Sequence, residues 1–510
     1  MKNNQNRREF LKTVGLTAAA LTIPGCNVST RLGGSLGACP GRRPGAGGER
    51  DGSFQNPNII FIMTDDMGIG DTTVYNPQSK IPTPNLGRLA AQGVVFTDAH
   101  SPSSMCTPTR YALLTGRYCW RTWLWRGVYG GYDRPLIKKD RMTIASMLQK
   151  HGYSTACVGK WHLGMDWAQK QKRHVPHDEP YDQFNIDFSK PIKEGPATRG
   201  FDYFFGTSGC TTDDPPMVFI ENDRTVGIPS EICPVDPANE DRELLMVPGW
   251  RHEDADIKFT NKSVEFIQKH VEEKPDTPFF LYFPLSVPHI PWFPPDMVKG
   301  KSDAGPRGDQ VVLADWSLGQ IMDVLDRLKI SDNTLLIFTS DNGPREGVNG
   351  HKSSWHYRGQ KGDLWEGGHR MPFIARWPGK IKPGTTCNEL TCFTDMMATF
   401  AAIVGADLPD KAGPDSFNIL PALLGEKLNG PIRHSLIHHN GQLAIRAGDW
   451  KLIPGIRGNG TEGGRKALFN LKDDPDEKYD LYDQRPVIVD RLTKRLKKQM
   501  SQGYSRSMKT

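Results

Sequence analysis

Apolar segments of two kinds alternate along the middle of the chain. Continuous apolar runs, typical of strands buried on both faces, cover residues 58–63, 153–158, 279–285 and 334–339, with a shorter run at 94–97. Longer segments repeat their apolar residues with the helical period and predict helices at 84–92, 143–150, 255–272 and 309–328. This alternation predicts an α/β fold, with a large, mostly parallel sheet sandwiched between layers of helices.

Polar side chains follow each of the four long strands at the point where the strand ends. In chain order they are Asp65 and Asp66, then Lys160 and His162, then His289, then Asp341 and Asn342. The carboxyl ends of parallel strands meet at one edge of a sheet, which is where open α/β proteins build their sites. We therefore expect these side chains to lie together in one site.

The pattern changes near residue 430. Short alternating runs at 435–439, 443–447 and 450–453 predict an antiparallel meander, and 487–500 reads as a basic amphipathic helix. We expect a main domain over 57–430 and a smaller C-terminal α+β domain over 431–510.

The N-terminus has the pattern of an export signal. Arg7 and Arg8 precede an apolar run, 14–23, that is too short to span a membrane, so residues 1–26 predict export by the twin-arginine machinery. Cys26 ends a lipoprotein-like box in which Pro24 replaces the usual small residue, so lipid anchoring at Cys26 stays open. Residues 27–56, rich in Gly, Arg, Pro and Ser, predict a flexible linker. We expect a bacterial protein that is periplasmic, or a lipoprotein of the outer membrane or cell surface.

Net charge and cysteine spacing indicate which kinds of partner and metal site the chain could have. The formal net charge is +6, but residues 1–56 hold eight basic and three acidic residues, which leaves about +1 for the rest. The chain therefore gives no reason to expect a nucleic-acid partner. None of its nine cysteines has the spacing of a zinc ribbon, and disulfides among them cannot be assigned from sequence.

The segment 101–110 contains a Cys-x-Pro-x-Arg core, Cys106 to Arg110, and continues through Leu113 to Gly116. This block resembles the motif of the type I, formylglycine-dependent sulfatases, the arylsulfatase family. The resemblance implies that a maturation enzyme oxidises Cys106 to formylglycine (3-oxoalanine). The hydrated aldehyde would then attack sulfur, and sulfate would leave as the carbonyl re-forms.

Two further segments, 152–162 and 361–368, are also similar to this family, so the resemblance covers roughly residues 57–400. It implies an alkaline-phosphatase-like fold. By the same resemblance Arg110 would hold the nucleophile, while Lys160 and Lys361 would bind sulfate oxygens. His289 would protonate the leaving alcohol, and His162 would assist the second hydroxyl as it expels sulfate.

The acidic residues at the strand ends are hard oxygen donors. Asp65, Asp66, Asp341 and Asn342 suit calcium or magnesium and do not suit zinc. The resemblance implies that they hold one Ca²⁺ together with residue 106.

The substrate is less closely defined. Residues 198–206 and 219–224 resemble bacterial exo-acting sulfatases of sulfated glycans, nearest to N-acetylgalactosamine-6-sulfatases. This implies a sulfated carbohydrate, such as a fragment of a glycosaminoglycan or of another sulfated polysaccharide. Candidate sugar contacts on loops expected to rim the mouth are Asp213, Asp214, His351, Trp355, His356 and Arg358. The alternatives are a phosphonate or phosphate diester hydrolase of the same superfamily, and a catalytically inactive glycan-binding lipoprotein.

Overall fold

The computed structural model describes residues 56–233, 244–345 and 347–507. The predicted export signal, with Cys26, and the predicted linker up to residue 55 lie outside the described residues. The seven cysteines in the described part are all unpaired. Within the same residues, none of the helices is both long and apolar enough to cross a membrane.

The largest sheet has ten strands in the order β13-β2-β12-β11-β1-β10-β4-β5-β6-β7. Its centre consists of β11 (Thr334–Ser340), β1 (Asn58–Thr64), β10 (Phe279–Pro284), β4 (Ser154–Lys160) and β5 (Tyr203–Thr207), all parallel. On one side follow β12 (Phe373–Arg376), antiparallel to β11, and β2 (Val94–Phe96), antiparallel to β12. On the other side follow β6 (Ile220–Glu221), antiparallel to β5, and β7 (Arg224–Thr225), antiparallel to β6. The edge strand β13 (Thr385–Cys387) runs parallel to β2. The predicted large, mostly parallel sheet is confirmed.

The four long apolar runs of the sequence become four neighbouring strands, β11-β1-β10-β4. Every residue of β1 is buried, because helices cover both faces of the sheet there. Alternate residues of β1 serve different cores: Ile60 and Ile62 belong to one cluster, and Ile59, Phe61 and Met63 to the other.

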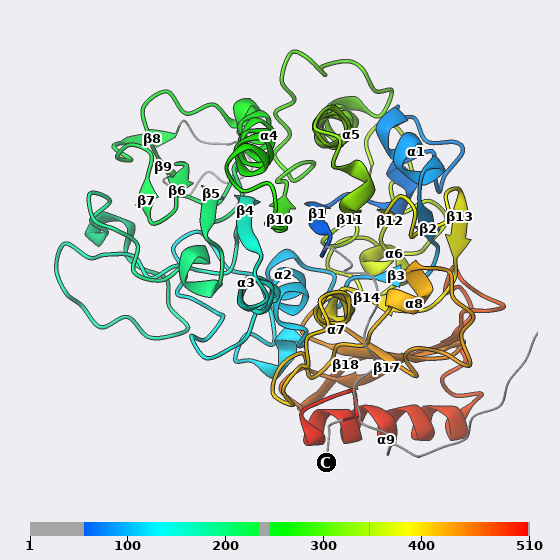
Figure 1. Ribbon diagram of the computed structural model, residues 1–510. Coiled ribbons are helices and arrows are strands. Elements are labelled where there is room, and N and C mark those ends of the chain that lie inside the picture. Colours follow the sequence, from blue (N-terminus) through cyan, green and yellow to red (C-terminus); the bar gives the residue numbers. More distant parts are fainter. Residues whose placement is uncertain (1–55, 234–243, 346, 508–510) are drawn as a thin grey trace, which may run out of the picture. The chain divides into compact units, whose positions relative to one another are not determined.

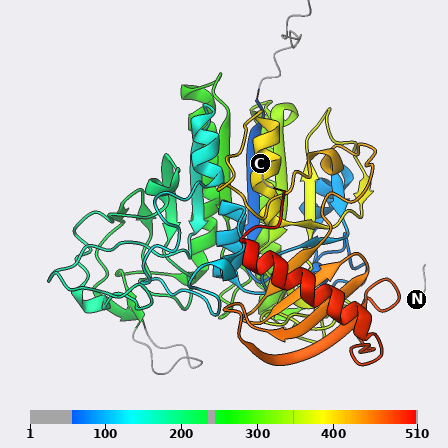
Figure 2. The same cartoon turned by 90° about the horizontal axis from the view of Figure 1, so that it is seen from below.

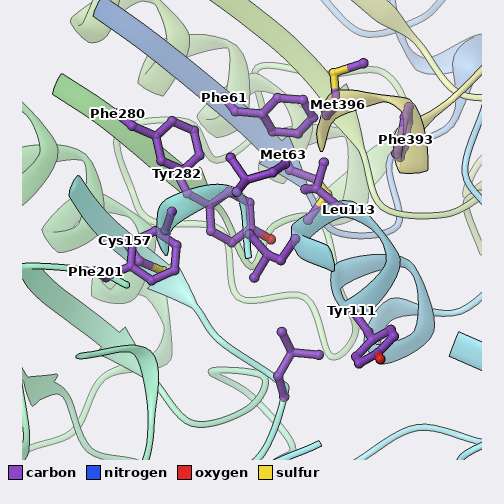
Figure 3. Packing of buried hydrophobic residues seen from close by; sticks show 14 of the residues in the cluster. Phe61, Met63, Tyr111, Leu113, Cys157, Phe201, Phe280, Tyr282, Phe393 and Met396 are labelled. Atoms are coloured by element: carbon purple, nitrogen blue, oxygen red, sulfur yellow. The ribbon is translucent and has the colours of Figure 1, made fainter. Parts of the chain in front are cut away.

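Helices line up on both sides of the sheet (Figure 1). On one face lie α1 (Pro84–Ala91), α4 (Ala255–Glu273) and α5 (Gly305–Arg327), with α5 in contact with the other two. On the other face lie α2 (Cys106–Thr115), α3 (Ile144–Lys150) and α7 (Met396–Ile403). Figure 3 shows the second of these cores, where Phe61, Tyr282 and Phe280 from the sheet meet Leu113 of α2 and Met396 of α7. The predicted layers of helices are confirmed.

The C-terminal residues form a second, four-stranded antiparallel sheet in the order β15-β16-β17-β18. Its strands are β15 (Leu436–His439), β16 (Leu443–Ala447), β17 (Trp450–Ile456) and β18 (Glu462–Asn470). Helix α9 (Pro486–Gln502) crosses this sheet, as Figure 2 shows, and buries Leu492 and Leu496 against it. The smaller C-terminal α+β part is thus confirmed, and residues 55–510 form one compact unit that contains both sheets.

The remaining elements are short. They comprise β3 (Ala99–His100), β8 (Glu231–Cys233), β9 (Leu244–Met246), β14 (Thr391–Cys392), α6 (Glu366–His369) and α8 (Leu420–Leu423). Sequence patterns did not predict β5, β12, β18 or α7. Strand β18 begins with exposed charged and glycine residues, so only its second half has an apolar pattern.

Candidate active site

The turn after β1 places two carboxylates beside the end of β11. The parallel register pairs Thr64 with Ser340, so the next residues of the two strands, Asp65 and Asp341, emerge side by side. Asp66 has a positive φ of 65°, a conformation that Asp tolerates better than most residues. Its backbone N–H donates to Asp341 Oδ1 (3.2 Å), and its Oδ1 accepts from Asn342 Nδ2 (2.7 Å). The predicted acidic group is therefore assembled by strand pairing.

Cys106 begins helix α2 next to these carboxylates. The residue before it, Met105, is extended, Pro108 lies in the first turn, and Gly116 ends the helix in a left-handed conformation. Cys106 is buried, and its Sγ lies 3.4 Å from Asp65 Oδ1. Burial, and then the negative charge of Asp65, raise the pKa of the thiol well above its ordinary value. An unmodified Cys106 is therefore a neutral thiol.

Arg110 lies one helical turn after Cys106 and points to the same carboxylates. Its Nη2 is 2.7 Å from Asp341 Oδ2 and 3.3 Å from Asp65 Oδ2, and its Nη1 donates to the carbonyl of Lys160 (3.0 Å). Burial, followed by repulsion from Asp65, raises the pKa of Asp341 to about 6. Through its contacts with Asp341 and the carbonyl of Lys160, Arg110 connects the first turns of α2 to the ends of β11 and β4.

Two lysines complete the charged group. Lys160 Nζ donates to Asp65 Oδ2, and Lys361 Nζ donates to Asp66 Oδ2 at 2.8 Å. Burial opposes ionisation of Asp65, but the charges of Lys160, His289 and Arg110 outweigh it and hold the pKa of Asp65 well below its ordinary value. Three acidic and three basic side chains thus balance one another in a buried site.

The two predicted histidines flank this group and differ in their environment. His162 Nε2 donates to the carbonyl of Tyr129 (2.5 Å) and lies 3.3 Å from Asp214 Oδ2. Burial, and then the charge of Lys160, lower the pKa of His162 to about 3, so its imidazole is neutral near pH 7.

His289 stands on the opposite side of the acidic group. Its Nδ1 donates to the carbonyl of Ile290 (2.6 Å), which leaves Nε2 facing the site, 3.8 Å from Asp66 Oδ2. That orientation gives Nε2 access to a substrate atom bound beside Asp66.

The acidic group fits a hard divalent cation. Asp65, Asp66, Asp341 and Asn342 supply only oxygen ligands and are almost fully buried. Asn342 Oδ1 is buried and has no hydrogen-bond partner among the described residues, which is costly unless a ligand satisfies it. Ligand atoms of Asp65, Asp66, Cys106 and His289 also lie within 4.8 Å of one another.

Cys210 also lies in the site, and the sequence analysis missed it. Its Sγ is 2.8 Å from Lys160 Nζ and 3.7 Å from His289 Nε2. Cys210 follows β5, whose apolar run 203–207 was not recognised as a strand. The rule that polar groups follow parallel strands would have found it, because β5 is parallel to β4.

The candidate sugar contacts fall into two groups. Asp213 and Asp214 lie at the site: Asp213 Oδ1 is 3.7 Å from His289 Nδ1, and Asp214 Oδ2 accepts from the backbone of Cys210 (3.0 Å). Burial raises the pKa of Asp213, whereas the neighbouring His162 and Lys160 outweigh burial and lower the pKa of Asp214.

The other four candidates lie on the segment 351–358, and most of their polar contacts are with other parts of the chain. His351 is buried and its Nε2 lies 3.0 Å from Asp71 Oδ1. His356 Nδ1 is 2.5 Å from Asp476 Oδ1, and Arg358 donates to the carbonyl of Glu477 while stacking on Trp365. Trp355, half-buried, packs against His356. Contact of these four with a sugar stays a prediction.

Comparisons with known proteins agree with this fold. A family model described as Sulfatase matches residues 57–406, and one described as N-sulphoglucosamine sulphohydrolase, C-terminal, matches residues 356–505. An N-acetylgalactosamine-6-O-sulfatase of Bacteroides thetaiotaomicron is 36% identical over 87% of this chain and 93% of its own. Human arylsulfatase A is 32% identical over 83% of each chain. A solved structure from work on glycosaminoglycan metabolism by Bacteroides thetaiotaomicron has 34% identity and a TM-score of 0.76, covering 88% of this chain and all of the other.

The fold and the family match define a sulfuric ester hydrolase with an alkaline-phosphatase-like fold. The chain belongs to the sulfatase family and is an enzyme of the arylsulfatase type.

Proposed function

We propose that this enzyme is an exo-acting sulfatase that removes sulfate from sulfated sugars, including the 6-O-sulfate of N-acetylgalactosamine in glycosaminoglycan fragments. The relative named for that substrate supports the proposal, because it matches over nearly the full length of both chains. The observation that carries it is the meeting of Cys106 with three cations, Arg110, Lys160 and Lys361, in one buried site. Such a group suits a sulfate ester, which brings negative charge to the cations.

Residue 106 would carry the nucleophile. As a thiol it is unreactive, because its raised pKa keeps it protonated, so modification to formylglycine is consistent with its surroundings. Formylglycine would supply a hydrated aldehyde whose hydroxyl attacks sulfur. Arg110, one turn later, would orient residue 106 through Asp65, the carboxylate that both contact.

One Ca²⁺ fits the oxygen donors Asp65, Asp66, Asp341 and Asn342, with residue 106 beside them. When bound, the ion would polarise a sulfate oxygen and stabilise negative charge. Lys160 and Lys361, which contact Asp65 and Asp66, would bind sulfate oxygens.

The histidines would move protons. As an imidazolium, His289 would give its Nε2 proton to the oxygen of the leaving alcohol, while its Nδ1–H, bonded to the carbonyl of Ile290, fixes the ring. His162 is neutral, with Nδ1 buried and unpartnered among the described residues, so it would accept a proton there during release of sulfate. Asp213 and Asp214 would contact the sugar.

The enzyme would also need two partners outside its substrate. A formylglycine-generating enzyme would have to modify Cys106 before folding, since α2 is buried throughout. The twin-arginine machinery would then export the folded protein, with a lipid anchor at Cys26 still open.

The proposal is tested with a panel of sulfated mono- and disaccharides and an aryl sulfate, assayed with the wild type and Cys106→Ala. We expect sulfate release from 6-sulfated N-acetylgalactosamine by the wild type alone, and intact-mass analysis of the 101–110 peptide showing conversion of the thiol to the aldehyde. Faster turnover of phosphate diesters or phosphonates than of any sulfate ester would favour the related hydrolase instead. Sugar binding without turnover by fully converted enzyme would favour an inactive glycan-binding lipoprotein.

A further inference from the structure

Positive charge is concentrated in two segments beside the site. Residues 134–141 and 169–178 hold seven basic and two acidic residues, a net charge of +5, whereas the whole of 57–510 carries only about +1. The rest of the folded chain is therefore net negative. A cluster of one sign on such a background creates a local potential that attracts anions.

These segments line two cavities. The larger, of about 610 Å³, is bordered by Arg117, Lys138, Arg141 and His177, with Trp123 on one side. The second, of about 490 Å³, is bordered by Arg134, Lys172, Arg173, His174 and Lys193. In Figure 1 the second segment belongs to the teal loops to the left of α3.

Most of the cations around the two cavities are not neutralised by the protein. Among the described residues, no ion pair involves Lys138, Arg141, Lys172, Arg173 or Lys193. Arg141 gives one N–H to the carbonyl of Lys411 (2.8 Å) and is otherwise half-exposed, while the other four are exposed. The neighbouring Lys139, by contrast, is paired with Glu194 at 2.8 Å. The first five charges are therefore available to an anionic ligand.

Both cavities lie next to the segment that follows His162 of the active site. Leu136, which lines the larger cavity, donates its N–H to the carbonyl of Leu163 (3.0 Å), the residue after His162. Asp166, which lines the second, is four residues beyond His162 and so within about 14 Å of it. Trp123, 42% exposed, lies 5.6 Å from the ring of Tyr129, whose carbonyl holds His162.

We propose that the two cavities form a second binding site for anionic sugars. It would hold further sulfate or carboxylate groups of a sulfated oligosaccharide whose terminal residue lies beside Cys106. This inference rests on the proposed function and extends it to longer chains as preferred substrates. Each exposed cation contributes up to about 1 kcal/mol and is screened by salt. Trp123 would offer a flat apolar face to a sugar ring.

The test compares two double variants, Lys138→Ser/Arg141→Ser and Lys172→Ser/Arg173→Ser, with a matched control, Lys269→Ser/Lys274→Ser. The control lysines border a different cavity, beside Glu265 and Glu273. Substrates are N-acetylgalactosamine-6-sulfate and a chondroitin sulfate hexasaccharide, at low and high ionic strength. We expect either double variant to raise KM for the hexasaccharide about tenfold with kcat unchanged, and to leave the monosaccharide within about twofold. High salt should shrink the difference between variant and wild type.

Equal changes on both substrates, or no change on either, would overturn the inference, and so would an equal effect of the control. If the wild type releases sulfate from neither sugar, the proposed function fails, and a calorimetric titration with the hexasaccharide decides the inference alone. Binding that weakens in the two double variants and not in the control supports it, while unchanged binding refutes it. Thermal melting of each variant establishes that it is folded.

Discussion

At the scale of single residues, the site depends on how burial and charge set protonation. His162 is neutral because it is buried beside Lys160, and Cys106 is a neutral thiol because it is buried beside Asp65. His289 differs, since its Nε2 faces the site between Asp66 and Cys210. Its role should therefore show in reactions whose leaving group needs a proton.

Replacing His289 with Ala tests that role. A sugar alkoxide is a poor leaving group, whereas an aryl oxide is a good one. Loss of the general acid should therefore reduce kcat/KM at least about 100-fold on a sugar sulfate but less than about tenfold on an aryl sulfate. Steady-state rates on the two substrates provide the measurement. His151→Ala, which alters an exposed histidine bonded to the carbonyl of Met147, serves as the control. Equal losses on the two substrates would refute the acid role.

Asn342 allows the metal proposal to be tested without any rate measurement. A cation that binds only the folded state raises Tm, and the increase grows with the logarithm of its concentration. We expect Ca²⁺ to raise the Tm of the chelator-treated wild type. The Asn342→Ala variant should need at least about tenfold more Ca²⁺ for the same increase in Tm, because the substitution removes the buried Oδ1 of Asn342. If neither the chelator nor Ca²⁺ changes the Tm of the wild type, the proposal is contradicted.

At the scale of elements, a buried ion pair joins the loop after β1 to α5. Arg307 donates to both carboxylate oxygens of Asp71 (2.7 Å each) and to the carbonyl of Asp66 (2.9 Å). His351 contacts the same carboxylate. The pair therefore fixes the turn that presents Asp65 and Asp66, although it lies outside the charged group itself.

Removing one partner should be severe, because the other charge stays buried. We expect Arg307→Met to lower the free energy of unfolding by about 3–5 kcal/mol, measured by denaturant titration. The half-exposed Arg88, paired with Asp323 and Asp326, provides the contrast: Arg88→Met should lower the free energy of unfolding by no more than about 1 kcal/mol. Similar costs for the two variants would contradict the assignment.

The same pair predicts a specific sensitivity to acid. Burial opposes ionisation of Asp71, but Arg307 and His351 outweigh it and lower its pKa to about 2. A depressed pKa contributes stability above the unfolded value near 3.8, and this contribution, about 2 kcal/mol, is lost as the pH falls from about 4 to about 2. The difference in unfolding free energy between wild type and Asp71→Asn should therefore shrink over that range. A difference independent of pH would contradict the prediction.

At the scale of the whole chain, the C-terminal sheet holds the loop that carries Cys106. The carbonyl of His439 in β15 accepts from Ser103 Oγ (2.7 Å) and from the backbone of Ser104, and His438 Nδ1 donates to the carbonyl of Ser101 (3.2 Å). The loop on which a maturation enzyme would act is therefore covered in the folded protein. Modification before folding, followed by export of the folded enzyme, is the order consistent with this arrangement.

The export prediction concerns residues 1–26. Twin-arginine signals require the arginine pair itself, so Arg7→Lys/Arg8→Lys should leave active enzyme in the cytoplasm although the charge is unchanged. Sulfatase activity in fractionated cells is the measurement, and Arg31→Lys/Arg42→Lys in the predicted linker is the control. Normal export of the first variant would refute this route.

Much of the fold was predictable because its strands are buried on both faces. Such strands give continuous apolar runs, which is why β1, β4, β10 and β11 were identified with the polar groups that follow them. Strand β18 and the antiparallel β12 were missed, since a half-exposed or short strand leaves a weak pattern. Helix α7 was missed although it is strongly apolar, because short apolar runs do not distinguish helix from strand.

The sequence by itself determined which side chains are available for the chemistry: a cysteine in a sulfatase-like motif, hard oxygen donors and cations. Local pattern is enough to place most of them, because they follow a buried strand or lie in the first turns of a helix. Only the tertiary structure decided which residues share the site, because that depends on strand order and register, as with the pairing of Thr64 and Ser340. The tertiary structure added Cys210 to the site and buried His351 against Asp71. It also shifted the pKa values through burial, which no local pattern records.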